Sequence, residues 1–194
     1  MQSDKRVAYH KFVLTNLQPK TLYYFEIMNQ ARTYVYERVK TLIVYYSRTG
    51  TTKKAAEILA EELKAEIEEI EDTACRRGII GYLISGRDAV RKKLTVLKPA
   101  KYDVSDFDLV VIGTPIWGWN ISTPVRTYIA INKGKFKKVA FFCTMRGSGA
   151  VKVFLDMESI ASKKPVATLA LLEKDVKNKI RESRISSFAQ KIVF

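Results

Sequence analysis

The sequence predicts an α/β fold in which a parallel sheet has helices on both faces. Five short apolar runs, each followed by a helical pattern, alternate along residues 40–194. Such alternation is typical of parallel sheets with right-handed crossovers. Residues 109–113 (Leu-Val-Val-Ile-Gly) are apolar throughout, as in a strand that is buried on both faces. A hydrophobic content of 47% supplies the core of such a domain.

The individual elements follow from periodicity and from turn residues. Fully apolar or alternating runs indicate strands, and amphipathic runs that begin after Gly, Thr or Pro indicate helices. Strands are expected at residues 42–46, 65–70, 109–113, 139–143 and 165–172. Helices are expected at residues 51–64, 150–162 and 174–192, with another that ends at residue 131. The second strand alternates polar and apolar residues, so we expect it at an edge of the sheet.

Residues 75–97 are the least regular part of the domain. Gly78, Gly81 and Gly86 interrupt an apolar run, and residues 87–97 then follow a basic, helical pattern. We therefore expect a glycine-marked loop followed by a crossover helix. A second hypothesis makes this segment a cover over a ligand or a docking surface for a partner.

Charge and composition argue against several classes of function. The formal net charge of +14 raises nucleic acid or an acidic protein as partners. Lys and Arg are nevertheless spread over nearly every segment, with only small clusters at residues 91–93 and 133–138. This distribution favours a solvated basic surface over a nucleic-acid module. His10 is the only histidine, which argues against His-dependent catalysis and metal binding in the main domain.

The sequence is typical of a cytoplasmic protein. No apolar run approaches the ~20 residues that span a bilayer, and residues 1–6 lack the apolar core of a signal peptide. Cys75 and Cys143 lie far apart, without the spacing of metal ligands, which fits a reducing compartment. We expect each thiol to be a small buried apolar group.

The loop after the first strand has the composition of a phosphate site. Residues 47–52 (Ser-Arg-Thr-Gly-Thr-Thr) supply four hydroxyl groups, and Gly50 lets the backbone turn and approach a ligand closely. The helix that begins here adds free N–H groups and the positive end of its dipole. The loop lacks the GxxxxGK pattern of triphosphate sites and the GxGxxG pattern of dinucleotide sites. A terminal monophosphate is the favoured ligand, and an ordinary turn capped by Thr is the alternative.

Two further loops follow the third and fourth strands. Residues 114–124 carry Trp117 and Trp119 on a framework of Gly and Pro, and residues 144–149 are rich in Gly. Ligands of open parallel sheets bind at the carboxyl ends of the strands, where the strand order reverses, so the three loops should meet there. They would suit a phosphate, a flat aromatic ring and the hydrogen-bonding edge of that ring. Core packing is the alternative for either Trp, but such a loop favours ligand contact.

These motifs resemble those of the flavodoxin-like family, and in detail those of small single-domain flavodoxins, over residues 40–194. Residues 47–52 are similar to the phosphate loop of the family, residues 113–118 to its second flavin loop and residues 143–149 to its third. The resemblance implies a three-layer fold with five parallel strands in the order 2-1-3-4-5. It also implies FMN as the cofactor, bound without a covalent link.

The resemblance assigns roles to individual residues. The FMN phosphate would be held by Ser47, Arg48, Thr49, Gly50, Thr51 and Thr52. The isoalloxazine would be bordered by Pro115, Ile116, Trp117, Gly118 and Trp119, and Trp117 is expected to be the better stacking partner. The ring edge and ribityl chain would meet Thr144, Met145, Arg146, Gly147, Ser148 and Gly149. Arg146 is expected over the pyrimidine edge, where its positive charge would stabilise the anionic reduced flavin.

The implied function is electron transfer or other flavin-dependent redox chemistry, in which the flavin rather than a side chain reacts. An electron carrier and an oxidoreductase, namely an NAD(P)H-dependent FMN or quinone reductase, are both compatible with the sequence. Redox proteins or small-molecule electron donors and acceptors are the expected partners, and the oligomeric state stays open, with a homodimer among the alternatives. Electron-carrying flavodoxins are usually acidic, whereas residues 39–194 carry a net charge of +11. A flavin-free basic binding protein is therefore a further alternative.

Residues 1–39 do not resemble the start of this domain. Extended runs are expected at residues 9–17, 22–28 and 33–39. Residues 9–39 resemble the last strands of a fibronectin type III domain, including its Leu-x-Pro-x-Thr-x-Tyr pattern at residues 17–23. Three such strands cannot bury both faces of a sheet, so we interpret the segment as a remnant of an upstream domain or as the result of a start site placed too early.

Overall fold

The computed structural model describes residues 22–27, 30–35, 39–74, 78–176 and 180–193. The chain forms two compact units, Met1–Arg38 and Val39–Phe194.

In the first unit, β1 (Leu22–Ile27) and β2 (Gln30–Val35) pair as an antiparallel hairpin. The strand expected at residues 22–28 is present as β1. The run expected at residues 33–39 instead begins at Gln30, because the extent of β2 follows its pairing with β1. The strand expected at residues 9–17 lies outside the described residues, as do residues 36–38.

The second unit contains a parallel sheet with the strand order β4-β3-β5-β7-β8. Its strands are β3 (Thr41–Tyr45), β4 (Glu66–Glu69), β5 (Leu109–Trp117), β7 (Val139–Met145) and β8 (Thr168–Leu172). In chain order the arrangement is 2-1-3-4-5, which confirms the predicted topology. β4 lies at an edge of the sheet, as its alternating pattern indicates.

The central strands are those with the longest apolar runs. Every residue of β3 is buried, and Val110, Val111 and Ile112 of β5 have no exposed surface. Strands that are covered on both faces need no polar positions between their apolar residues. β5 also extends beyond the expected end at Gly113, because its last residues pair with β6 (Asn120–Ile121) in a short antiparallel ladder.

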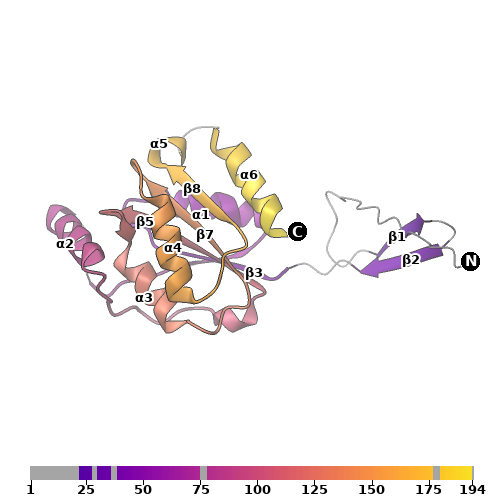
Figure 1. Cartoon of the computed structure of the whole chain (residues 1–194), viewed down its shortest axis with the longest axis horizontal. Coiled ribbons are helices and arrows are strands. Elements are labelled where there is room, and N and C mark those ends of the chain that lie inside the picture. The colour runs from indigo at the N-terminus through magenta and orange to yellow at the C-terminus, as the bar shows by residue number, and fades with distance from the viewer. Residues whose placement is uncertain (1–21, 28–29, 36–38, 75–77, 177–179, 194) are drawn as a thin grey trace, which may run out of the picture. The chain divides into compact units, whose positions relative to one another are not determined.

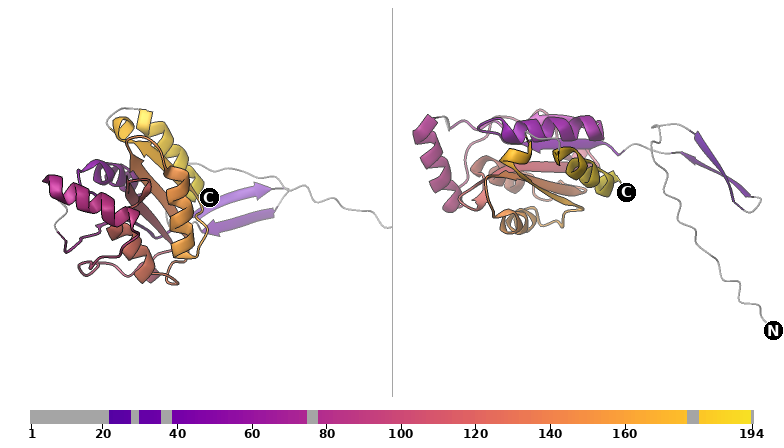
Figure 2. Two further views of the ribbon diagram at one scale, coloured as in Figure 1. Left: turned by 60° about the vertical axis from the view of Figure 1, so that its left-hand side comes forward. Right: turned by 90° about the horizontal axis from the view of Figure 1, so that it is seen from above.

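Helices cover both faces of the sheet, and Figures 1 and 2 show the three layers. The helices that cover the sheet are α1 (Thr51–Leu63), α3 (Thr123–Ile131), α4 (Ala150–Ala161) and α6 (Ile180–Val193), with a short α5 (Glu173–Val176) after β8. Leu59 of α1 and Phe188 of α6 belong to the core on one face. Ile129 of α3 and Met157 of α4 belong to the core on the other. The predicted α/β fold class is confirmed.

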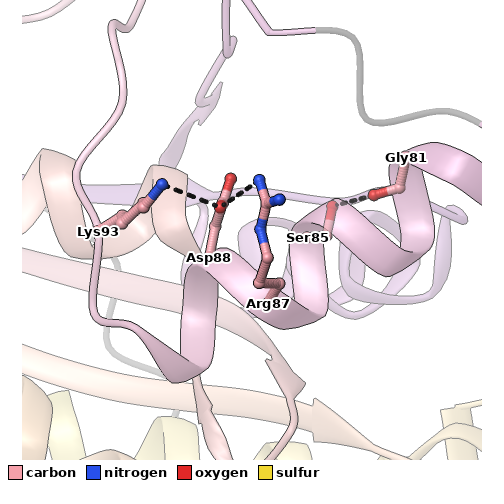
Figure 3. A network of polar contacts seen from close by, with 5 residues as sticks. All are labelled: Gly81, Ser85, Arg87, Asp88 and Lys93. Carbon is pink, nitrogen blue, oxygen red and sulfur yellow. Dashed lines mark hydrogen bonds and ion pairs between the residues drawn. The ribbon is translucent and has the colours of Figure 1, made fainter.

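The glycine-bearing run that was expected to be a loop is helix α2 (Gly78–Val90). A glycine inside a helix costs about 1 kcal/mol relative to alanine, and packing outweighs that cost here. Ser85 and Ala89 are buried, and Ser85 Oγ donates a hydrogen bond to the Gly81 carbonyl at 2.6 Å (Figure 3). The apolar run therefore forms the helix itself.

The helix expected over residues 87–97 is wrong beyond Val90. Lys92 has a φ of +51°, and this left-handed residue follows the helix end. Farther on, the amide of Lys98 donates to the carbonyl of Glu71 at 2.9 Å, so the chain pairs with the segment after β4. A contact with so distant a residue leaves no trace in the local helical pattern.

Cys143 lies in β7 and has no exposed surface, as expected for a buried thiol. Burial raises the pKa of this thiol to about 12, so the thiol stays protonated at neutral pH and is a poor nucleophile. Cys75 lies outside the described residues. Within the described ranges, no helix has the length and apolar character to cross a membrane. The same ranges hold no cluster of three or more His, Cys, Asp or Glu side chains suited to a metal ion.

Candidate functional site

A pocket of about 690 Å³ lies at the carboxyl ends of the central strands. All of the predicted site residues line it except Ser47, Gly50 and Gly149. The loops after β3, β5 and β7 therefore border a single pocket, although up to about a hundred residues separate them along the chain. The pocket is also lined by residues that the sequence prediction did not include: Leu83, Gly86, Arg87, Val90 and Glu173.

The first loop presents the start of α1 to the pocket. Gly50 is the N-cap of α1 in a left-handed conformation with φ +87°, and its amide donates to Ser47 Oγ at 3.1 Å. No side chain caps the first turn, and that turn contains no acidic residue. Free N–H groups and an uncompensated positive dipole end remain at the pocket, and an anion would satisfy both.

Thr52 connects the first loop to the third. Its Oγ1 lies 2.8 Å from Thr144 Oγ1, and both side chains are buried. This hydrogen bond occupies one side of the Thr52 hydroxyl and sets the spacing between the two loops. Thr49 and Thr51, which are less buried and also line the pocket, are the better placed hydroxyls for a ligand.

The second loop is a tight hairpin that separates the two Trp side chains. Ile116 pairs with Ile121, and Trp117 pairs with Asn120. Gly118 and Trp119 form the turn, with φ values of +53° and +57°, which is the left-handed geometry of a two-residue type I′ connection. A left-handed bulky residue is an outlier, and such strain often occurs at functional sites.

The two Trp residues, of which Trp117 was expected to be the better stacking partner, differ in burial. Trp117 is only 8% exposed and belongs to the core, where its ring meets that of Tyr46 edge-on with centroids 5.5 Å apart. Trp119 is 65% exposed, and its Nε1 donates to Ser148 Oγ at 3.3 Å. The ladder between β5 and β6 directs Trp117 inward, and the turn leaves the Trp119 ring at the pocket.

The third loop leads into α4 through Gly149, whose φ is +111°. A Cβ at this position would lie 3.0 Å from Trp119 Cδ1 and 3.4 Å from Trp119 Cα. Gly149 thus allows the second and third loops to approach each other. Its role is to shape the pocket, since it does not line the pocket itself.

Arg146, predicted to lie over a ring edge, forms an ion pair at the pocket. Its Nε donates to Glu173 Oε2 at 2.8 Å, and its side chain is 80% exposed. Glu173 is the first residue of α5 and lay outside the loops that the sequence singled out. Arg48, Arg87 and Arg146 line the pocket against the single carboxylate of Glu173, so the pocket is positively charged.

Helix α2 forms one wall of the pocket, and the hypothesis that its segment covers a ligand stays a prediction. Leu83, Arg87 and Val90 line the pocket, and a Cβ on Gly118 would lie 3.0 Å from Val90 Cγ2. The sequence signal for this wall was the apolar run that forms α2. The glycines in that run favoured the prediction of a loop.

A second hollow of about 930 Å³ lies between β4, the 95–101 segment and α3. It is larger, but none of the three loops lines it. The pocket at the loops is the candidate site because it combines an anion-binding helix start with an exposed aromatic ring and glycine-rich backbone.

Comparison with known proteins identifies the family and agrees with the fold. The model of the Flavodoxin family matches residues 40–183, whereas the search of curated proteins found no match. The crystal structure of a Lactobacillus acidophilus flavoprotein in complex with FMN aligns with a TM-score of 0.63 and 24% identity, over 78% of this chain and 99% of that chain. The NMR structure of the apo-form of the flavoprotein from the same organism aligns with a TM-score of 0.53 and 25% identity, over 68% and 91%. A Bacteroides uniformis protein aligns with a TM-score of 0.60 and 23% identity, over 75% and 99%.

Proposed function

The chain belongs to the flavodoxin family, and from this premise we propose that it binds FMN without a covalent link and transfers electrons through the bound flavin. One observation carries the proposal: the helix start, the exposed Trp119 ring and the glycine-rich third loop border one pocket. The FMN complex of the Lactobacillus acidophilus flavoprotein supports it.

The phosphate would lie at the start of α1. Thr49 and Thr51 would donate their hydroxyl groups, together with N–H groups of the first helical turn, and Arg48 would add a positive charge. The missing acidic residue in that turn fits a phosphate, because a carboxylate there would repel it. Gly50 and Ser47 would support the loop without touching the ligand.

The ring would lie between the second and third loops. Trp119 is placed to stack on it, whereas Ile116 and the α2 side chains Leu83 and Val90 would exclude water. The backbone near Gly147 and Ser148 would meet the ring edge. Arg146, held by Glu173 at 2.8 Å, would place a positive charge near the ring.

When bound, FMN would supply the redox chemistry, and the chain would supply binding, orientation and electrostatics. An electron carrier and an NAD(P)H-dependent reductase are both compatible with this pocket. We place the protein in the cytoplasm, which suits the reduced Cys143 thiol.

The direct test is the absorption spectrum of the purified protein, with mass spectrometry of the released cofactor. We expect a flavin spectrum and one FMN per chain after incubation with FMN. Steady-state assays with NADPH and a quinone then separate the two redox roles, since rapid turnover would identify a reductase. Colourless protein that takes up no FMN would leave the flavin-free alternative.

Replacing each Trp with Ala separates ring stacking from core packing. Trp119→Ala is expected to weaken FMN binding about 5- to 150-fold, because aromatic stacking contributes roughly 1–3 kcal/mol. Trp117→Ala is expected to lower the free energy of unfolding by about 3–5 kcal/mol, because it empties a buried site. FMN titration and urea unfolding of the apoproteins measure the two effects. A larger loss of FMN affinity in a well-folded Trp117→Ala protein would restore the ranking expected from the sequence.

A further inference from the structure

We propose that α2 and the segment after it form a docking surface for an acidic protein partner. This surface, called the α2 surface below, consists of the exposed side chains of Leu83, Ile84, Val90, Arg91, Lys92, Leu94 and Val96. The role of the partner as an electron donor or acceptor rests on the proposed function, whereas docking itself does not require flavin.

Apolar side chains are concentrated on the α2 surface. Five of the ten large hydrophobic residues that are exposed in the described parts of the chain lie between Leu83 and Val96, with exposed fractions from 36% to 70%. Single exposed apolar residues are ordinary, but a cluster of them marks an interaction site. Leu83 and Val90 also line the pocket, where FMN would cover part of them. Packing of a partner against Ile84, Leu94 and Val96, which do not line that pocket, would remove the rest of the cluster from water.

The charges beside this cluster are positive. Asp88 is the only acidic residue between residues 78 and 98, and its side chain is only 12% exposed. Arg87 and Lys93 both contact its Oδ1, at 3.3 and 3.8 Å (Figure 3). The carboxylate is thus neutralised from both sides and offers no negative charge to a partner.

Arg91 and Lys92 carry the net charge of the surface. Both are exposed, and neither forms an ion pair with any described residue. Their amides donate to the carbonyls of Arg87 and Ala89 at 3.0 Å, which holds them on the turn that ends α2. The α2 surface therefore combines an apolar cluster with two exposed cations that form no ion pair within the described part of the chain, a pattern that complements a partner with exposed carboxylates.

A second copy of the chain is a poorer occupant than an acidic protein. A two-fold interface brings the same patch of both subunits together, so the basic patch that contains Arg91 and Lys92 would face a second basic patch. A lipid surface is also a poorer fit. Interfacial helices carry their cations along a polar face opposite the apolar one, whereas the face opposite Leu83 is buried through Ser85 and Ala89.

The position of the α2 surface is suited to electron exchange. Leu83 and Val90 belong to the surface and also line the pocket that we assign to FMN. Figure 1 shows α2 at the end of the domain where the strands open into their loops. A protein docked on α2 would lie directly beside the flavin.

The test uses cytochrome c and its fully succinylated derivative, two probes of one fold in which lysine ammonium groups are exchanged for carboxylates. Binding is measured by biolayer interferometry at about 0.1 M salt, where the Debye length of about 10 Å confines the effect to nearby charges. We expect the acidic derivative to bind and native cytochrome c not to bind. Affinity for the derivative should fall as salt increases.

Matched charge reversals locate the binding site. Arg91→Glu/Lys92→Glu is expected to weaken binding of the derivative at least about tenfold, since each lost and reversed pairing costs on the order of 1 kcal/mol. Lys133→Glu/Lys138→Glu makes the same change of net charge at exposed sites outside α2 and should change the affinity less than about twofold. Leu94→Ser should weaken binding with an unchanged salt dependence.

Four results would overturn the proposal: equal losses in the two charge-reversal proteins, tighter binding of native cytochrome c, sedimentation with lipid, or self-association. Lipid is tested with vesicles of three parts phosphatidylcholine to one part phosphatidylglycerol, and self-association by sedimentation velocity. Binding to lipid or self-association would overturn the proposal if the Arg91→Glu/Lys92→Glu substitutions abolish it. Circular dichroism and FMN content confirm that each protein is folded. If the folded protein takes up no FMN but still binds the derivative, this inference stands and the proposed function is refuted.

Discussion

Riboflavin, which lacks the phosphate of FMN, is expected to bind the apoprotein about 1000-fold more weakly than FMN. The phosphate would accept hydrogen bonds from the Thr49 and Thr51 hydroxyls and from N–H groups at the start of α1. Hydrogen bonds to a charged group contribute about 1.5–3 kcal/mol each. Three of them contribute at least about 4 kcal/mol, which corresponds to a factor of about 1000 in the dissociation constant. Fluorescence titration of both flavins with the apoprotein measures this ratio.

Two glycine variants test whether the loop before α1 is responsible for the tighter binding of FMN than of riboflavin. Gly50 and Gly134 have φ values of +87° and +88°, and a Cβ on either would meet no atom within 4 Å. Alanine at either position is therefore expected to cost the same roughly 1–2 kcal/mol of stability, because only the left-handed conformation is penalised. Gly50→Ala alone should reduce the preference for FMN over riboflavin, by about tenfold. Similar affinities for the two flavins in the wild-type protein would place the phosphate outside this loop.

Gly113→Ala is expected to lower the free energy of unfolding by about 3 kcal/mol, at the upper end of the usual cost of overpacking. Gly113 pairs with Phe142 across β5 and β7. A Cβ at Gly113 would overlap Cζ and Cε1 of the Phe142 ring and lie 2.7 Å from its Cε2. Phe142 is fully buried, so its ring has no free space to move into. Thermal unfolding should show a melting temperature lower by roughly 6–12 °C.

The same Gly→Ala change has the opposite expected effect in α2. A Cβ on Gly86 would meet no atom within 4 Å, and alanine stabilises a helix by about 0.5–1 kcal/mol relative to glycine. Gly86→Ala should therefore raise the melting temperature slightly. The double variant Gly113→Ala/Phe142→Leu should recover part of the loss, because the smaller side chain makes room for the added methyl group. A Gly113→Ala protein as stable as the wild type would show that β5 and β7 can separate locally at little cost.

The fold was predictable because the residues of each strand follow a recognisable local pattern of apolar and polar side chains. Residues 109–113 are apolar at every position, which is the pattern of a strand covered on both faces, and β5 has that burial. The strand order came from the resemblance of the three loops rather than from the strands, whose pairing involves distant residues. The loops also identified most of the pocket, because loops after parallel strands meet at one end of the sheet.

The residues that the sequence misplaced depend on long-range packing. The glycines of α2 favour a loop by local propensity. Packing of the buried residues Ser85 and Ala89 offsets the helix-destabilising effect of these glycines. Glu173 enters the pocket from the residue after β8, and no local motif marks it. Local patterns report preferences of about 1 kcal/mol per residue, which a few buried contacts outweigh.

The two Trp residues show most clearly the difference between what the local sequence predicts and what long-range packing decides. Their spacing in a loop of Gly and Pro was sufficient to place an aromatic pair at the ligand end of the sheet. It was not sufficient to tell which ring is exposed at the pocket and which belongs to the core. That choice depends on the ladder between β5 and β6, which turns Trp117 toward Tyr46 and leaves Trp119 exposed in a left-handed turn. Composition and periodicity thus specify which kinds of group reach the site, and their orientation is set by pairing between segments that only the folded chain brings together.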